Sequence, residues 1–288
     1  MDIESKKFLG QPKNFVSIFN ALLFDGKQVL KPEYLKDENS ELVMNVSSKH
    51  VDIIKRYEDG TYLDLFVIES QSYVDPSMVA RVMEYESVAR MRYIRQNFKK
   101  HVPMHTRLPM ILTVVLYVGE SKWNAAKRLS ELEIIHPGFE DMFNEFKLNL
   151  IELNTNHKYN TGEKATQDFF DLLRMIYRKQ ILKEDLDREF NRDALYFAYV
   201  VTKNKELLSI YNKSEKGDVK VCRALDEMFE ESTNKGIQMG IKQGIEQGIA
   251  LKELFVYQTM LEKGFSVKAI ASIFSVSEES IKNLLMKA

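Results

Sequence analysis

Cysteine and long apolar runs are scarce in this chain of 288 residues. Cys222 is the only cysteine, which excludes an intramolecular disulfide and a cysteine-based zinc site and agrees with a reducing cytosol. No stretch approaches the roughly 20 apolar residues that a membrane helix needs. The opening MDIESKKFLG also lacks the apolar core of a signal peptide. We therefore expect a cytoplasmic protein with no membrane span.

Net charge is also nearly absent. The formal charge is -1 at pH 7, so no overall positive field attracts nucleic acid, and any such binding must use a local patch. Apolar residues make up 44% of the chain, which is enough for a full hydrophobic core. The length allows one large domain or two.

Helical and strand-like patterns alternate in the first half of the chain. Apolar residues recur at helical spacing in 13–24, and a helix is expected at 75–97, opened by Asp75-Pro76 as cap and first position. The expected strands are 42–46, 51–57, 62–69, 110–118 and 148–152. From 163 onward the pattern is mainly helical. We expect an α/β core over 1–160, a helical extension over 161–234, and a C-terminal segment over 235–288.

The second and third of these strands form a predicted hairpin, because Asp59-Gly60 between strand-like runs is a strong turn signal. A hairpin symmetric about this pair places Asp52 opposite Val67 and puts Asp52, Glu69 and Gln71 on one sheet face. Glu69 then lies diagonally from Asp52, at a Cβ separation of about 7–8 Å. An odd-numbered loop would move Asp52 to the other face.

Two carboxylates at this separation suit a hard cation such as Mg²⁺, which prefers oxygen ligands. Gln71 could orient a metal-bound water, although an amide is not a general base. On the following helix Arg81, Tyr85 and Arg92 form one stripe, with Arg81 placed to meet an anionic group. A basic run beyond it could follow a phosphate backbone; it comprises Arg92, Arg95, Lys99, Lys100 and Arg107. The alternatives are a structural ion pair for Glu69 and a solvated helix face for the basic run.

Several motifs occur in order: HVDII around Asp52, IESQS around Glu69 and Gln71, M-x-x-R-x-x-x-Y through Arg81 and Tyr85, VVLYVGESKW, and a C-terminal glycine repeat. In this order they resemble the PD-(D/E)XK nuclease superfamily, and more closely its recombination-promoting nuclease branch, whose members are often labelled transposases. The resemblance covers most of the chain. The E-x-Q triplet replaces the E-x-K of the superfamily.

The resemblance implies a restriction-endonuclease-like α-β-β-β-α-β core with a mixed sheet flanked by helices. It also implies Mg²⁺-dependent hydrolysis of DNA phosphodiesters, with Mn²⁺ as a substitute and a role in DNA recombination. Asp52 and Glu69 would bind the metal, and Gln71 would stand in the place of the lysine. Arg81, Tyr85 and Arg92 would contact DNA.

Two positions depart from the superfamily pattern. The helix 13–24 has no acidic residue where one is often found; Asn20 is the nearest polar candidate, and Asp25 or Glu41 could reach in. Gln71 cannot supply the positive charge of a lysine. The alternative to an active endonuclease is therefore a weak or inactive DNA-binding or self-assembling protein that keeps the fold. The sequence does not distinguish DNA from RNA as the substrate.

The C-terminal segment contains KGIQMGIKQGIEQGIA, in which each of four glycines is followed by isoleucine. Two alternatives stay open for this segment. It is either a helix that forms a homodimer through close packing, or a flexible connector. The end of the chain predicts a helical hairpin, with helices at 267–274 and from Ser277 to about Met286. Glu278 and Glu279 begin the second helix and would repel phosphate, which favours a packing role over DNA reading.

Overall fold

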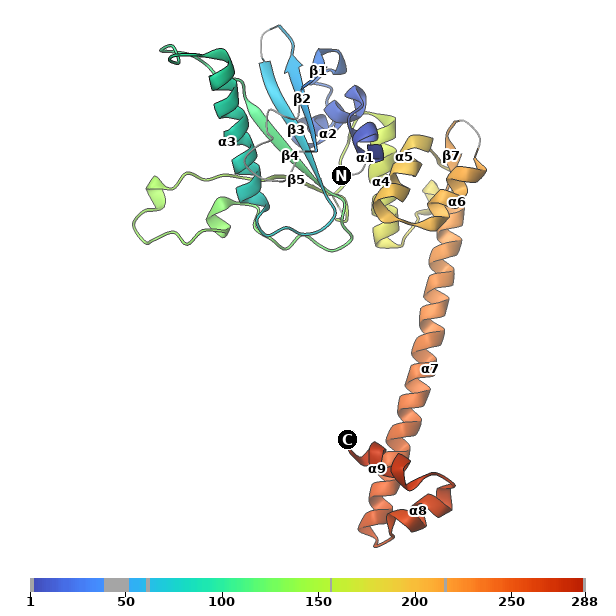
Figure 1. Ribbon diagram of the computed structural model, residues 1–288. Coiled ribbons are helices and arrows are strands. Elements are labelled where there is room, and N and C mark those ends of the chain that lie inside the picture. Colours follow the sequence, from blue (N-terminus) through green and yellow to red (C-terminus); the bar gives the residue numbers. More distant parts are fainter. Residues whose placement is uncertain (1–2, 39–51, 61–62, 156, 215–216, 287–288) are drawn as a thin grey trace. The chain divides into compact units, whose positions relative to one another are not determined.

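A computed structural model describes residues 3–38, 52–60, 63–155, 157–214 and 217–286 (Figure 1). The chain divides between Asp226 and Glu227 into two units, which we describe separately. Within the described residues, no helix is long and apolar enough to cross a membrane.

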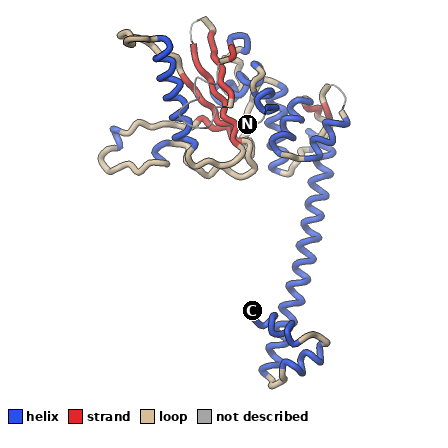
Figure 2. Tube along the Cα trace, viewed as in Figure 1, coloured by secondary structure: helices blue, strands red, loops and turns tan. Residues whose placement is uncertain are grey.

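The first unit is built on a five-stranded mixed sheet in the order β1-β2-β3-β4-β5 (Figure 2). The strands are β1 (Leu35–Asp37), β2 (Ile53–Glu58), β3 (Leu63–Gln71), β4 (Ile111–Tyr117) and β5 (Asn149–Glu152). β1, β2 and β3 pair antiparallel, whereas β3, β4 and β5 pair parallel. A mixed α/β fold with a helical C-terminus is thus confirmed. The first strand of the sheet, β1, is not among the predicted strands, and the predicted strand 42–46 lies outside the described residues.

The hairpin register differs from the prediction. Glu58 pairs with Leu63 instead of Thr61, and Ile53 pairs with Ile68. The expected two-residue turn needs positive φ at both central positions; Gly60 has φ 89°, but Asp59 is not among the residues with positive φ. The longer loop moves the register by two residues, which preserves the side-chain alternation.

Helices cover both faces of the sheet. α3 (Met78–Asn97) packs on the face formed by Ile54, Leu65 and Val67, against which it places Tyr85 and Ala89. On the other face α2 (Pro12–Phe24) brings Phe19 within 4.8 Å of Phe66, measured between ring centroids. The sheet is therefore buried on both sides, as its near-continuous apolar strands predict.

The helical extension packs against the N-terminal helix α1 (Ile3–Leu9). Phe8 of α1 contacts Phe169 of α4 (Lys164–Arg178) and Phe197 of α5 (Arg192–Thr202), with ring centroids 5.7 and 4.7 Å apart. The hydroxyl of Ser17 also donates to Thr166 across 2.8 Å. The remaining elements here are α6 (Lys205–Lys213) and the two-stranded β6 (Glu189–Phe190) and β7 (Val219–Lys220). The extension and the sheet thus share one core.

The long helix α7 (Cys222–Glu262) leads to α8 (Val267–Phe274) and α9 (Glu278–Met286). The glycine repeat is helical, as one of its two interpretations proposed. The predicted hairpin is confirmed: Ser266 Oγ accepts from Ala269 N, and Ser277 Oγ accepts from Ser280 N. A small core joins the three helices of the second unit, formed by Tyr257, Ile270, Ala271 and Ile281. This packing agrees with the structural role expected for the hairpin.

Candidate active site

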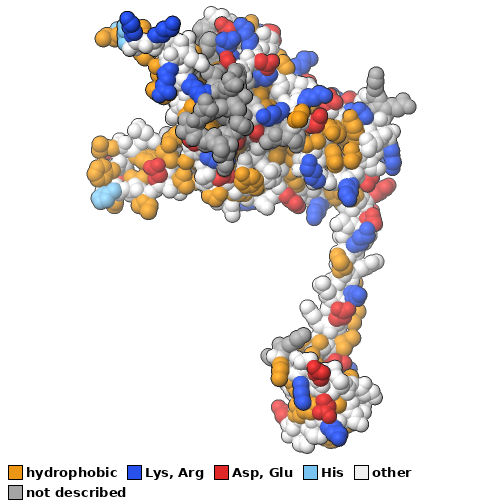
Figure 3. All heavy atoms as spheres, viewed as in Figure 1, with side chains coloured by type: hydrophobic (Ala, Val, Ile, Leu, Met, Phe, Trp, Pro, Cys, Tyr) orange, Lys and Arg blue, Asp and Glu red, His pale blue; other side chains and the backbone are white. Residues whose placement is uncertain are grey.

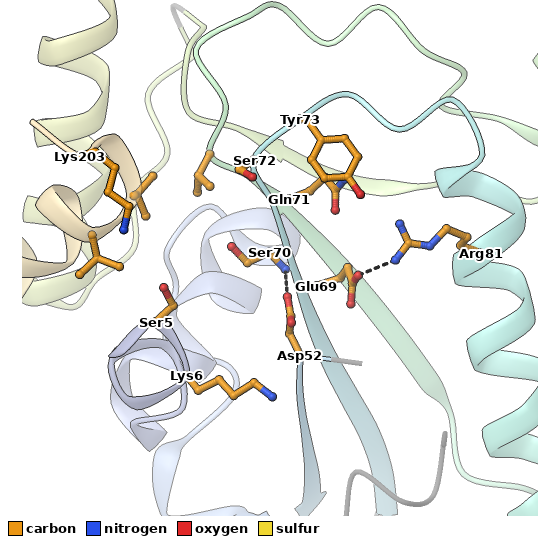
Figure 4. A pocket seen from close by; sticks show the side chains of 13 residues that line it. Ser5, Lys6, Asp52, Glu69, Ser70, Gln71, Ser72, Tyr73, Arg81 and Lys203 are labelled. Atoms are coloured by element: carbon orange, nitrogen blue, oxygen red, sulfur yellow. Dashed lines mark hydrogen bonds and ion pairs between the residues drawn. The ribbon is translucent and has the colours of Figure 1, made fainter. Parts of the chain in front are cut away.

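Asp52 and Glu69 are neighbours where β2 and β3 adjoin, with the Asp52 carboxylate directed at Ser70 and the Glu69 carboxylate directed at Arg81 (Figure 4). Asp52 immediately precedes β2, and one further step in the register from the Ile53–Ile68 pair brings it opposite Glu69. The prediction placed Glu69 diagonally from Asp52, whereas the structure places the two residues directly opposite each other, still on one face of the sheet. The backbone N–H of Ser70 donates to Asp52 Oδ2 across 2.8 Å. Asp52 is thereby tied to the strand that carries Glu69.

A cavity of about 600 Å³ opens over these carboxylates. Its wall combines the end of β3 with residues of α1 and α5, which are distant in sequence (Figure 4). The polar lining side chains are Ser5, Lys6, Asp52, Glu69, Ser70, Gln71, Ser72, Tyr73, Arg81 and Lys203. The four sequence-predicted residues Asp52, Glu69, Gln71 and Arg81 therefore share one cavity.

Arg81 is held by three partners within the protein. Its Nη2 donates to Glu69 Oε1 across 3.0 Å and to the Tyr85 hydroxyl across 2.9 Å, and its Nη1 donates to Asp75 Oδ2 across 2.5 Å. The Arg81 side chain is only 14% exposed. The anionic group expected near Arg81 is thus Glu69 itself, with Asp75 as a second. A DNA contact by Arg81 or Tyr85 stays a prediction.

Asp75 differs in role from the helix cap that was predicted. The helix begins at Met78, three residues later than Asp75, and Ser77 occupies the cap position. Asp75 Oδ1 accepts from Ser77 N and Ser77 Oγ across 2.9 and 2.6 Å. With its other oxygen bound to Arg81, Asp75 fixes the guanidinium next to Glu69.

Burial sets the electrostatics of Glu69. The residue is 4% exposed, and loss of hydration, together with the nearby Asp52 charge, raises the pKa of Glu69 to about 7. The charge of Arg81 and the Asp52 backbone amide oppose this rise. Burial of the guanidinium acts to lower the pKa of Arg81, but the hydrogen bonds with Tyr85 and Asp75 and the charge of Glu69 outweigh it and raise that pKa. Near neutral pH Glu69 therefore exchanges a proton readily, which is typical of functional carboxylates.

Two buried atoms in the cavity wall have no hydrogen-bond partner within the described part of the chain: Glu69 Oε2 and Gln71 Nε2. A buried carboxylate oxygen without a hydrogen-bond partner is suited to bind a hard cation, because such cations take oxygen ligands. Asp52 supplies the second carboxylate. In the described ranges no group of three or more His, Cys, Asp or Glu side chains could hold a metal. Asp52 and Glu69 together fit Mg²⁺ as a site with only two protein carboxylates, where the ion keeps several waters.

Of the three candidates for a further acidic position, Asn20 and Asp25 do not line the cavity as far as the structure describes it. Asn20 is fully buried, and its side chain both donates to Leu30 O and accepts from Leu30 N, each across 2.9 Å. Asp25 forms the left-handed end of α2, with φ 52°. Glu41 lies outside the described residues. Neither the Asn20 position nor the Asp25 position therefore adds an acidic side chain to the described cavity wall.

Two cations that the sequence did not reveal line the cavity instead. Lys6 comes from α1, and Lys203 is the left-handed residue that ends α5, with φ 56°. Neither lies near the motif in sequence, and no local pattern marks them. Arg92 is not among the lining residues; it lies seven residues beyond Tyr85 on α3, toward the end where Lys and Arg side chains gather (Figure 3).

Comparison with known proteins identifies a family. Searches of curated proteins and of solved structures found no match. The family model described as "Putative transposase, YhgA-like" matches residues 6–207. This range extends from Lys6 to α6 and contains every lining residue of the cavity except Ser5. Since the match covers more than half of the chain, the protein belongs to the YhgA-like transposase family.

Proposed function

We propose that this protein is a metal-dependent endonuclease that hydrolyses DNA phosphodiester bonds. One observation carries the proposal: the half-buried Asp52 and the buried Glu69 line one cavity, and Glu69 Oε2 has no partner among the described residues. The element order α2, β1, β2, β3, α3, β4 supports it, since the PD-(D/E)XK resemblance implies that series. Family membership adds a link to DNA transactions.

Asp52 and Glu69 would hold Mg²⁺, or Mn²⁺ in its place, through their carboxylate oxygens. A bound ion would polarise a phosphoryl oxygen and lower the pKa of the attacking water. Arg81 holds Glu69 Oε1 and so orients the opposite oxygen, Oε2, for a ligand. The N–H of Ser70 fixes Asp52 in the same way. Both carboxylates are thus preorganised, which lowers the cost of assembling the site.

Gln71 contributes a hydrogen-bond donor without charge. Its Nε2 is buried and without a partner in the described structure, so it can donate to a phosphoryl oxygen or to a water. It cannot replace the charge of a lysine. Lys6 and Lys203, which line the same cavity, would supply positive charge to the phosphate of the substrate.

The remaining DNA contacts would lie along α3 and the segment after it. Arg95, Lys99, Lys100 and Arg107 are exposed there, close in sequence to Arg92 (Figure 3). Because the net charge of the chain is only -1, such a local run is the means by which it could follow a phosphate backbone.

The test is cleavage of supercoiled plasmid with Mg²⁺ or Mn²⁺ by the native protein, Asp52→Asn and Glu69→Gln. Glu58→Gln is the matched control, because Glu58 is a carboxylate of the same hairpin that contacts Lys36 at the surface. We expect the native protein and the control to nick DNA and the two site variants to lose about 100-fold or more of the rate. Equal rates for all four proteins would reject the site.

The neutral Gln71 and the ion pair of Glu69 with Arg81 favour a second candidate. In this alternative the protein binds DNA or assembles without useful hydrolysis. Its signature would be DNA binding by the native protein with no cleavage under either metal. The same assay with an RNA substrate distinguishes the two nucleic acids.

A further inference from the structure

The middle of α7 carries a continuous apolar surface that nothing in the second unit covers. Its isoleucines at 237, 241, 245 and 249 are 53–58% exposed. Figure 3 shows hydrophobic side chains along this helix. An exposed row of large aliphatic side chains is characteristic of an interface.

Glycines form the neighbouring row of the same helix. Gly236, Gly240, Gly244 and Gly248 each precede one of the isoleucines, and a Cβ at any of them would meet no atom within 4 Å apart from its chain neighbours and the backbone of its own helix. Glycine in a helix interior costs about 1 kcal/mol relative to alanine. No neighbour in the described structure requires these glycines. A partner that approaches the backbone closely would require them.

A row of charges runs beside the isoleucines. At 100° per residue, Lys235, Lys242, Glu246 and Glu253 fall within about 40° of one another around the helix, and about 100° from the mean direction of the isoleucines. Lys235 also contacts Glu231 within its own helix at 2.5 Å. The charges therefore flank the apolar row.

These charges are arranged symmetrically about Gly244. Lys242 and Glu246 lie two residues on either side of it, and Lys235 and Glu253 lie nine residues on either side. A two-fold axis that lies midway between two copies of the helix, at the level of Gly244 and perpendicular to both, would bring each lysine to the level of a glutamate of the second copy. The partner that matches this pattern is a second copy of the same helix, antiparallel to the first.

We propose that α7 forms an antiparallel homodimer centred on Gly244. The isoleucine rows of the two copies pack together and the glycines allow close approach, while Lys242–Glu246 and Lys235–Glu253 pair across the interface. Apolar burial supplies most of the affinity, since exposed ion pairs contribute little. The charges select the orientation.

A parallel dimer lacks this complementarity. With the two-fold axis along the helices, the charged row of one copy lies on the opposite side of the pair from that of the other. The lysines and glutamates then never meet. The charge pattern therefore distinguishes the two orientations, although the apolar row alone would allow both.

The first test is the sedimentation equilibrium of the full chain, whose mass is 33.6 kDa. We expect a dimer, and we expect Ile241→Glu combined with Ile245→Glu to weaken it at least about tenfold, because two charges enter an apolar interface. The matched control is Gln243→Glu with Gln247→Glu, which adds the same charges at the same spacing on the other side of the helix. A monomeric native chain, or equal weakening by the control, would overturn the proposal. Circular dichroism checks that both variants keep the helix.

The second test measures orientation. A spin label on Ser232→Cys, an exposed position outside the proposed charge pairs, reports the distance to the same position in the second copy; Cys222 is buried and does not compete. In the antiparallel dimer the two labels are 24 residues apart along the axis, or about 36 Å at 1.5 Å per residue. A parallel dimer in register would give about 10 Å, the separation of two packed helices, and would overturn the antiparallel arrangement.

Discussion

Arg81 donates to Glu69 Oε1 across 3.0 Å and binds Asp75 with its other terminal nitrogen. The opposite oxygen of Glu69, a residue that lines the cavity, has no hydrogen-bond partner in the described part of the chain. Arg81 therefore supports the candidate site, because its charge opposes the rise that burial causes in the pKa of Glu69.

Removing Arg81 should strongly destabilise the fold. Both side chains of the pair are less than a sixth exposed, at 14% for Arg81 and 5% for Glu69. Loss of one partner of a buried pair costs about 3–5 kcal/mol. We expect a loss near this size for Arg81→Met by urea denaturation at pH 8. The control is Arg90→Met, whose ion pair with Glu86 spans 3.5 Å at a 41% exposed side chain and should change stability by less than about 1 kcal/mol. Similar losses for both variants would contradict the assigned role.

The stability of the metal-free protein should depend on Glu69 in a defined pH window. Its pKa is raised from 4.5 to about 7 on folding, so between these values the folded state holds more protons than the unfolded state. The contribution of Glu69 to stability therefore falls as pH rises from about 4.5 to about 7, and is constant outside this window. Denaturation in EDTA of the native protein and Glu69→Gln, at several pH values, measures the difference.

Comparison with the variant isolates Glu69 from other groups. Burial also raises the pKa of Glu86, which gives a pH dependence of the same sign in both proteins. The native-minus-variant difference removes it. A difference that is flat from pH 4 to pH 8, or that grows with pH, would show that the Glu69 pKa is not raised.

Sequence patterns predicted that Asp52 and Glu69 form a pair, but not which residues surround that pair. Side chains in strands alternate, so Asp52 and Glu69 share a face for any even-numbered loop. The error of two residues in the predicted register therefore left both side chains on the predicted face. The partners of Glu69 depend on where α3 begins, and the Asp75-Pro76 signal misplaced that start. Lys203 lies 132 residues beyond Gln71, and only the packing of α5 on α1 brings it to the cavity. No local period carries such long-range information.

Lys203 should contact nucleic acid, and its geometry permits a matched test. Lys203 and Lys179 each end a helix in the left-handed conformation, with φ 56° and 51°, but only Lys203 lines the cavity. Asparagine tolerates this conformation, so Lys203→Asn and Lys179→Asn make equal changes in charge with little backbone strain. We expect Lys203→Asn to lower the slope of log affinity for DNA against log salt by about one, because one phosphate contact is lost. Equal slopes for the two variants would exclude Lys203 from the interface.

A buried ion network joins α4 to α5, the helix that ends at Lys203. Its loss should lower the stability of the fold without changing metal binding at Asp52 and Glu69. Asp168 is 1% exposed and accepts from Arg188 Nη2 across 2.8 Å and from Asn191 N across 2.7 Å, which joins α4 to the start of α5. Asp168→Ala leaves the Arg188 charge with fewer partners and should cost about 3–5 kcal/mol. The control Asp187→Ala removes an exposed ion pair with Arg223 and should cost less than about 1 kcal/mol. Since Asp52 and Glu69 lie on the sheet, folded Asp168→Ala should still bind Mn²⁺ with near-native affinity, measured by calorimetry at low temperature. Loss of Mn²⁺ binding in the folded variant would mean that the helical extension supplies part of the metal site.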